Sequence, residues 1–169
     1  KADLVITSYM INELPEKDRE KAVENLWNAT NKLLIIIEPG TPAGFTNILK
    51  IRKNLLKSGG YIVAPCCCLH ECPIPKDDWC AFYARVARSS VHRHAKSGTL
   101  GYEDEKFSYI AFSKVPVNNS GERILRHPQI NSGYVKVKVC TANGIEEKTY
   151  SKKDKEIYKK VRKMDAGQK

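Results

Sequence analysis

The chain has no long hydrophobic run, and this argues against a protein built of membrane-spanning helices. Its longest apolar stretch, residues 33–37, has the length of a single strand, whereas a membrane-spanning helix needs about 20 apolar residues. It also has no Gly-x-Gly-x-x-Gly turn, with which many nucleotide-binding folds hold phosphate groups. Because an initiator methionine is absent, we expect a fragment in which a targeting segment would not be visible.

Acidic residues are scarce relative to basic ones: 19 against 29, a formal net charge of +10. The length of 169 residues and a hydrophobic fraction of 41% are typical of a globular protein with one good core. A positive surplus of this size favours a polyanionic partner, above all nucleic acid. The alternative is a lysine-rich surface that serves only solubility.

The cysteines are concentrated in one short segment. Five of the six lie between Cys66 and Cys80, and Cys140 stands alone in a later strand-like segment. Thiolates are soft ligands that suit zinc, copper(I) or iron–sulfur clusters. A disulfide framework or buried free thiols are the alternatives. The tight clustering in a lysine-rich chain favours a metal site.

The first part of the chain alternates between apolar strand-like runs and amphipathic helical segments. This alternation is typical of βαβ units in a largely parallel α/β sheet. The predicted elements are, in order, strand 3–10, helix 17–29, strand 32–38, a helix from the N-cap Thr41 and Pro42 to Gly59-Gly60, and strand 61–64. Ligands of such sheets gather beyond the carboxyl ends of the strands. Residues 8–13, residues 38–41 and the segment from Cys66 onward are therefore candidate site material.

The second part of the chain predicts a change of architecture after a linker. Its predicted elements are helix 77–96, strand 107–115 antiparallel to the strand 61–64, linker 116–122, strands 133–141 and 146–150 around an Asn143-Gly144 turn, and a basic tail 151–163. The linker divides a domain of residues 1–115, with its cysteine loop at 65–80, from a small β-rich appendage of residues 123–169.

Two basic segments are candidate RNA contacts. On the predicted helix 77–96, Arg85, Arg88, His92 and Lys96 follow helical spacing and would lie along a phosphate backbone. The tail adds a second group of cations: Lys152, Lys153, Lys155, Lys159, Lys160, Arg162 and Lys163. The alternative for both is a solvated charged face without a partner.

Four motifs together carry a family resemblance. DLVITSYMINELP, IIIEPGTPAGF, an APC…CP…DWC block and GYEDEKFSY occur in this order, and the chain resembles the Rsm22-type ribosomal small-subunit proteins. That family includes bacterial members and mitochondrial small-subunit assembly factors related to class I methyltransferases. The resemblance implies the C-terminal part of a class I methyltransferase-like (Rossmann-like) sheet, with a cysteine metal-binding insertion and a small β-rich C-terminal appendage.

The resemblance also implies a 4Fe-4S cluster held by four cysteines. They fall on Cys66, Cys72, Cys80 and Cys140. The sequence departs from the family pattern at Cys67 and Cys68, where a proline and a histidine are usual, and either thiol is an alternative to Cys66. Zinc is the alternative metal, because four thiolates suit it equally well.

The implied function is action on the ribosomal small subunit, in assembly or translation, through rRNA binding. An active S-adenosylmethionine-dependent rRNA methyltransferase and a zinc-stabilised RNA-binding module are the alternatives. By the resemblance, Ser8, Asn12 and Glu13 line the cofactor cleft, and the glycine-rich cofactor turn would lie upstream of Lys1. The same residues also suit a helix-entry turn, and no catalytic base is identified. The implied location is the cytoplasm in a bacterium or the mitochondrial matrix in a eukaryote.

Overall fold

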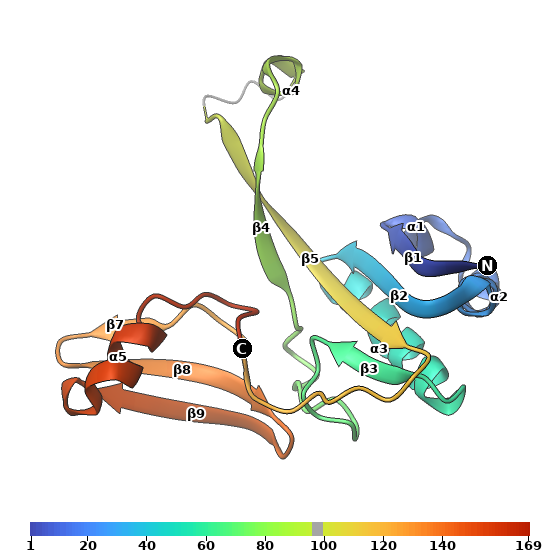
Figure 1. Ribbon diagram of the computed structural model, residues 1–169. Helices are drawn as coiled ribbons and strands as arrows, with labels where there is room; N and C mark the ends of the chain where they lie inside the picture. The colour runs from blue at the N-terminus through green and yellow to red at the C-terminus, as the bar shows by residue number, and fades with distance from the viewer. Residues whose placement is uncertain (96–99) are drawn as a thin grey trace.

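The computed structural model describes residues 1–95 and 100–169, except for the side chains of His92 and Arg93. It has a mixed α/β fold with two separate sheets, and the cysteine-rich segment lies between them (Figure 1). No helix in the described ranges is long and apolar enough to cross a membrane.

The first sheet is organised around one strand. In spatial order it contains β1 (Ala2–Ser8), β2 (Thr30–Pro39), β5 (Tyr102–Ser113) and β3 (Tyr61–Ala64), and β4 (Phe82–Ala87) also pairs with β5. β1 and β2 are parallel, but β5 runs antiparallel to β2, β3 and β4. The predicted antiparallel pairing of β5 with β3 is thus confirmed. The prediction of a largely parallel sheet is wrong, because β5 separates β2 from β3.

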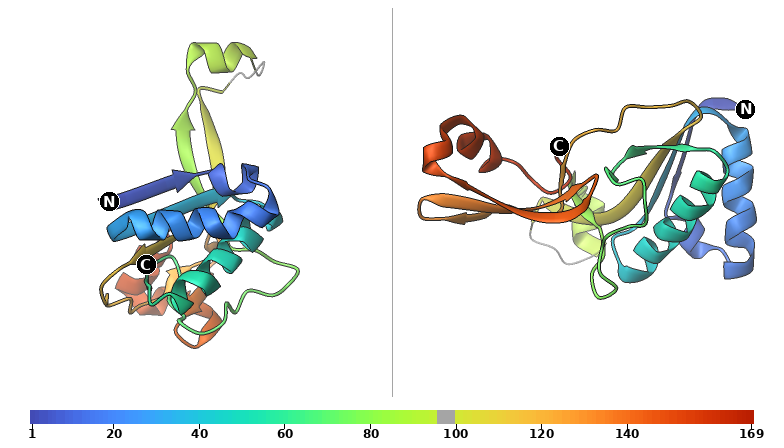
Figure 2. Two further views of the ribbon diagram at one scale, coloured as in Figure 1. Left: turned by 90° about the vertical axis from the view of Figure 1, so that its right-hand side faces the viewer. Right: turned by 90° about the horizontal axis from the view of Figure 1, so that it is seen from below.

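Two helices cover one face of this sheet (Figure 2). α2 (Glu16–Ala29) and α3 (Pro42–Lys57) both pack on the alternate strand residues that point to that face, while the short α1 (Met10–Glu13) follows β1. Their common core consists of Ile11, Val23, Trp27, Leu34, Ile36, Ile48, Ile51, Leu55, Ile62, Ile110 and Phe112. The apolar side chains that recur about every 3.6 residues in the helices therefore pack on those that recur every second residue in the strands, and together they form one apolar layer.

The predicted boundaries of α3 are confirmed. The Thr41 hydroxyl accepts a hydrogen bond from the Gly44 backbone N–H at 3.1 Å, and Pro42 occupies the first turn. After the helix, Gly59 adopts a left-handed conformation with φ of 77°, which only glycine adopts at little cost.

The segment after the cysteines is a strand, and the predicted helix 77–96 is wrong. β4 pairs with β5 from Phe82–Phe107 to Ala87–Tyr102, and only the short α4 (Ser90–Ala95) is helical. The spacing of the apolar residues in this segment fits both a helix and a strand. The strand forms because pairing with β5 satisfies its backbone hydrogen-bonding groups. The β4–β5 hairpin projects from the rest of the molecule, with α4 at its tip (Figure 1).

The second sheet holds its own small core. It contains β6 (Arg123–Ile124), β8 (Tyr134–Thr141), β7 (Gln129–Asn131) and β9 (Gly144–Ser151), and the 3₁₀-helix η1 (Lys152–Asp154) and α5 (Lys155–Val161) follow. Tyr158 and Val161 of α5 pack on Val135, Val137 and Val139 of β8. The predicted β8–β9 hairpin is confirmed, but its turn consists of Ala142 and Asn143, one residue before the predicted Asn143-Gly144, because Gly144 already pairs with Thr141. Residues 114–122 contain neither helix nor strand.

Replacing Gly44 by alanine tests the packing at the start of α3. A Cβ atom at this position would lie 2.0 Å from the Pro39 carbonyl oxygen, so the helix start must shift away from β2. We expect the free energy of unfolding to fall by about 1–3 kcal/mol, measured by urea denaturation. Gly101→Ala is the control, because a Cβ atom there meets nothing within 4 Å. Equal stability of both variants would contradict this account.

Candidate metal centre

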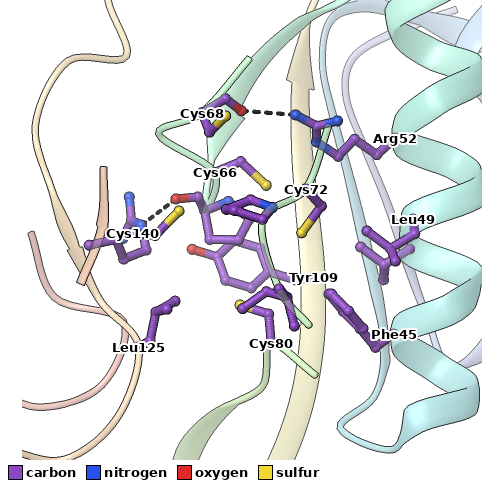
Figure 3. A pocket seen from close by; sticks show the side chains of 15 residues that line it. Phe45, Leu49, Arg52, Cys66, Cys68, Cys72, Cys80, Tyr109, Leu125 and Cys140 are labelled. Carbon is purple, nitrogen blue, oxygen red and sulfur yellow. Dashed lines mark hydrogen bonds between the residues drawn. The ribbon is translucent and has the colours of Figure 1, made fainter. Parts of the chain in front are cut away.

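A small cavity of about 30 Å³ lies between the two sheets, and cysteine sulfur lines it from several directions (Figure 3). Cys66, Cys72, Cys80 and Cys140 all contribute to its wall, and Cys68 lies at its edge. The rest of the wall is largely apolar and includes Phe45, Ile48, Leu49, Ile74, Tyr109 and Leu125. All four residues of the predicted ligand set therefore line one cavity, although 73 residues lie between Cys66 and Cys140 in the sequence.

Each of the four cysteines is held by a different part of the fold. Cys66 follows β3, Cys72 lies in the loop, Cys80 lies two residues before β4, and Cys140 lies in β8 of the second sheet. Side chains of neighbouring segments fix the backbone on each side of the cavity. The Ser108 hydroxyl of β5 donates to the Cys80 carbonyl at 2.7 Å. The loop is thus tied to the first sheet on both sides of Cys72.

Contacts between the two sheets converge on the same place. Arg123 of β6 donates from Nε to the Pro65 carbonyl and from Nη1 to the Gly167 carbonyl, each at 2.5 Å. Asn119, in the segment that joins the sheets, donates to the carbonyl oxygens of Ile62 and Cys66. These bonds hold β3 and the cysteine loop against the second sheet.

The two additional cysteines differ from the four in their surroundings. Cys67 is buried and lines a separate groove on the other side of the loop, together with Tyr61 and Leu69. The Cys68 thiol donates to the Glu71 carbonyl at 3.7 Å, and in Figure 3 its sulfur lies away from the hollow that Cys66 and Cys72 face. Of the three consecutive thiols, Cys66 has the most central position. All six cysteines, each within the described ranges, are free thiols.

Burial makes these thiols reluctant to ionise on their own. It raises the pKa of Cys66 to about 11, against a smaller lowering effect of the nearby Arg52, and neighbouring cysteines raise it further. Burial is also the main reason why the pKa values of Cys72, Cys80 and Cys140 are raised. A bound cation deprotonates thiols outright, since the thiolate is the metal ligand. At neutral pH the group is therefore ionised only when a cation compensates for its charge.

The sulfur atoms surround a hollow and do not converge on one point. In the described part of the chain, no three Cys, His, Asp or Glu side chains are arranged to hold a single ion. In a tetrahedral zinc site the sulfur atoms would lie about 3.8 Å apart, given zinc–sulfur bonds of about 2.3 Å. In a 4Fe-4S cluster the four thiolates lie further apart, because each binds a different iron atom.

The predicted cofactor residues lie at the carboxyl end of β1, and one of them belongs to a polar network. Ser8 and Glu13 are exposed, whereas Asn12 is half-buried. The side-chain oxygen of Asn12 accepts a hydrogen bond from Asn47 Nδ2 at 3.4 Å, and its backbone carbonyl oxygen accepts one from Arg19 Nη2 at 3.0 Å.

The centre of this network is Glu38, which belongs to the candidate segment 38–41 but whose burial was not predicted from the sequence. Its carboxyl group is fully buried, one oxygen accepts from Asn47 at 3.4 Å and the other has no partner among the described residues. Burial is the main reason why the pKa of Glu38 is raised. An acidic residue inside a buried strand was the one signal in the sequence that pointed to it.

The predicted RNA-binding residues are arranged differently from the helical stripe on which that prediction rested. Arg85 and Arg88 lie in and just after β4, and each pairs with a carboxylate of β5: Asp104 at 2.7 Å and Glu103 at 2.9 Å. The His92 side chain and the whole of Lys96 lie outside the described residues. The acidic partners were present in the sequence, but only the register of β4 against β5 brings Asp104 opposite Arg85 and Glu103 close to Arg88.

The fold and the cysteine-lined cavity define a mixed α/β protein with a thiol-rich centre. Comparison with known proteins assigns the chain to a family. The family model described as mitochondrial small ribosomal subunit Rsm22 matches residues 1–169. The chain belongs to this family, and the resemblance noted from its motifs is confirmed. It is also 30% identical over 146 residues to the human ribosome assembly protein METTL17, mitochondrial. That alignment covers 79% of this chain and 30% of the human protein.

Replacing Glu38 by glutamine tests the buried carboxyl through the pH dependence of stability. A raised pKa in the folded state stabilises the fold below the carboxyl's ordinary pKa, and this contribution is lost as pH rises through the folded-state pKa. Between about pH 4 and pH 7, we expect the variant's free energy of unfolding to rise relative to wild type. Urea denaturation at a series of pH values measures the difference. Glu147→Gln, which changes an exposed carboxylate, should follow wild type; a flat difference for Glu38→Gln would refute the assignment.

Proposed function

We propose that this chain forms the iron–sulfur-binding part of a mitochondrial factor that assists the assembly of the small ribosomal subunit through rRNA binding. Family membership supports the ribosomal role, and the description of the family and the name of the human relative support a mitochondrial location over a bacterial one. The observation that carries the metal part is the meeting of Cys66, Cys72, Cys80 and Cys140 at one cavity.

The motifs of the chain favour a 4Fe-4S cluster over zinc. Four thiolates suit both kinds of centre, and the cluster is the one that the resemblance of the cysteine motifs to the Rsm22-type proteins implies. The apolar wall keeps water from the centre, and burial slows the loss or oxidation of such a group. When bound, the cluster would supply a cross-link and an electron-accepting centre.

In this proposal the metal centre joins the two sheets, because each sheet supplies some of its cysteine ligands. Three ligands come from the loop of the first sheet and Cys140 comes from β8 of the second. A link through metal closes a long loop of chain and so stabilises the arrangement chiefly by restricting the unfolded state. The second sheet, with its basic α5, is thereby fixed relative to the first.

The positive charge of the second sheet is the better candidate for RNA contact. Arg85 and Arg88 are already paired with carboxylates, which offsets their attraction for phosphate. On η1, on α5 and just after it, Lys153, Lys160 and Lys163 are exposed and have no carboxylate partner among the described residues. Phosphate contacts of this kind bind without regard to sequence and depend strongly on salt.

Methyl transfer is the second hypothesis. Ser8 and Glu13 are exposed at the end of β1 and are free to contact S-adenosylmethionine together with a part of the protein outside this chain. Asn12 is the weaker candidate, because its side chain and carbonyl already hold Asn47 and Arg19.

Replacing Cys72 or Cys140 by serine tests the metal centre. We expect the wild-type protein, purified without oxygen, to be brown and to contain matching iron and acid-labile sulfide. Each variant should lose most of both, because an alcohol is a poor ligand for iron in such clusters. Iron, sulfide and zinc analyses with the visible spectrum measure the outcome.

Cys67→Ser is the matched control for these variants, since Cys67 is buried, as Cys140 is, but lines the other groove. It should retain the cluster. If the wild-type protein is colourless and contains stoichiometric zinc, the centre is a structural zinc site and the cluster assignment is wrong. Full retention in the Cys72 and Cys140 variants would refute the ligand set.

Removing three lysines tests the RNA surface. We expect the triple variant Lys153→Gln, Lys160→Gln, Lys163→Gln to bind a small-subunit rRNA fragment more weakly and with a flatter salt dependence. If all three contact phosphates, the slope of log affinity against log salt should fall by about 2–3. Filter binding at several salt concentrations measures it.

The control for this variant removes the same charge elsewhere, at the exposed Lys17, Lys53 and Lys57 of α2 and α3. A similar loss of slope in both variants would mean that net charge, and not this face, determines the binding.

A further inference from the structure

Arg52 is a buried cation without an anionic partner. It lies on α3, its exposed fraction is 6%, and it faces the cysteine cavity (Figure 3). Its Nη2 atom donates to the carbonyl oxygens of Cys68 and His70, at 2.8 and 2.5 Å. Its Nε atom is buried and has no hydrogen-bond partner, and no carboxylate pairs with the guanidinium among residues 1–95 and 100–169.

Such an arrangement is unfavourable unless something negative lies beside it. Guanidinium is always charged in proteins, and a buried charge is costly unless it is paired. Carbonyl oxygens offer dipoles, which compensate for part of the charge only. The thiols Cys66, Cys68, Cys72, Cys80 and Cys140 line the cavity together with Arg52, and they become anionic when they bind a metal.

Arg52 and the thiols line the same cavity. The guanidinium is held there by its hydrogen bonds to the Cys68 and His70 carbonyl oxygens of the cysteine loop. A positive charge fixed at this place stabilises negatively charged sulfur ligands beside it. Four thiolates around either iron–sulfur or zinc carry more negative than positive charge, so a ligated centre would supply the missing anion.

We propose that Arg52 is the counter-ion of the four-cysteine centre and helps to set its reduction potential. This inference rests on the proposed function. A fixed positive charge beside the centre stabilises the ligated form over the empty one. It also favours the reduced cluster, which carries one more negative charge, and so raises the potential.

Two substitutions separate the charge of Arg52 from its hydrogen bonds. Arg52→Gln removes the charge, whereas Arg52→Lys keeps it but removes the guanidinium, whose Nη2 atom donates to both carbonyl oxygens. Lys53→Gln is the control, because it removes an exposed charge from the neighbouring position of the same helix. The full-length protein is purified without oxygen in each form, and circular dichroism verifies its fold.

Two measurements are then made on each form: the rate at which a chelator removes the metal, and the reduction potential from a titration followed by electron paramagnetic resonance. We expect Arg52→Gln to release metal at least tenfold faster. Its potential should fall by about 59 mV or more, which is a tenfold change for a one-electron couple. Arg52→Lys should remain closer to wild type in both, and Lys53→Gln should match wild type.

The outcomes distinguish this inference from the proposed function. Wild-type protein without iron, sulfide or zinc would overturn both. A metal-bearing wild type with an unchanged Arg52→Gln variant would overturn only the role of Arg52. Equal effects of Arg52→Gln and Arg52→Lys would also overturn it, because the carbonyl bonds, and not the charge, would then be responsible. If the metal is zinc, the release rate alone decides between these outcomes.

Discussion

The pairing of three strands with β5 is the constraint on which the rest of this structure depends. β2, β3 and β4 all run antiparallel to it, and it contributes Ile110 and Phe112 to the core. Because β3 leads into Cys66 and β4 follows Cys80, the two anchors of the cysteine loop are set by their registers on the same strand. The cavity between the sheets is therefore a consequence of backbone hydrogen bonding as much as of the cysteines themselves.

A second consequence of this arrangement is that polar atoms at the boundary between the two sheets are hydrogen-bonded chiefly through side-chain donors. Arg123, Asn119 and Arg52 each donate to carbonyl oxygens of the cysteine loop or its flanks. A loop with little regular structure leaves such carbonyls without ladder partners, and buried carbonyls need donors. The boundary between the two sheets thus consists of the thiol-lined cavity and, around it, arginine and asparagine side chains that donate hydrogen bonds to loop carbonyls.

Local features of the sequence predicted a good part of this. The N-cap Thr41, the glycines after α3 and the hairpin between β8 and β9 have short-range physical causes, and the structure confirms all three, with the hairpin turn one residue earlier than predicted. The clustering of the cysteines directed attention to the correct loop. The family resemblance added Cys140, which spacing alone would not have joined to the others.

The failures arose where distant pairing overrides local pattern. The segment around β4 has apolar residues that suit a helix, yet β5 supplies a partner strand for it. The same pairing placed Asp104 opposite Arg85, so an arginine that was predicted to be free for RNA contact forms an ion pair within the protein. The burial of Glu38 and Arg52 was not predicted for a related reason: the burial of a charged residue depends on the packing of the whole fold and leaves little trace in the nearby sequence.

The position of Cys140 also bears on the order of events when the protein is made. The ribosome synthesises β8 after the whole first sheet, so a growing chain can display Cys66, Cys72 and Cys80 long before the fourth thiol exists. A centre that takes Cys140 as its last ligand closes only when β8 has emerged and docked. Metal insertion would then be a late maturation step, and its completion would report that both sheets have been made and joined.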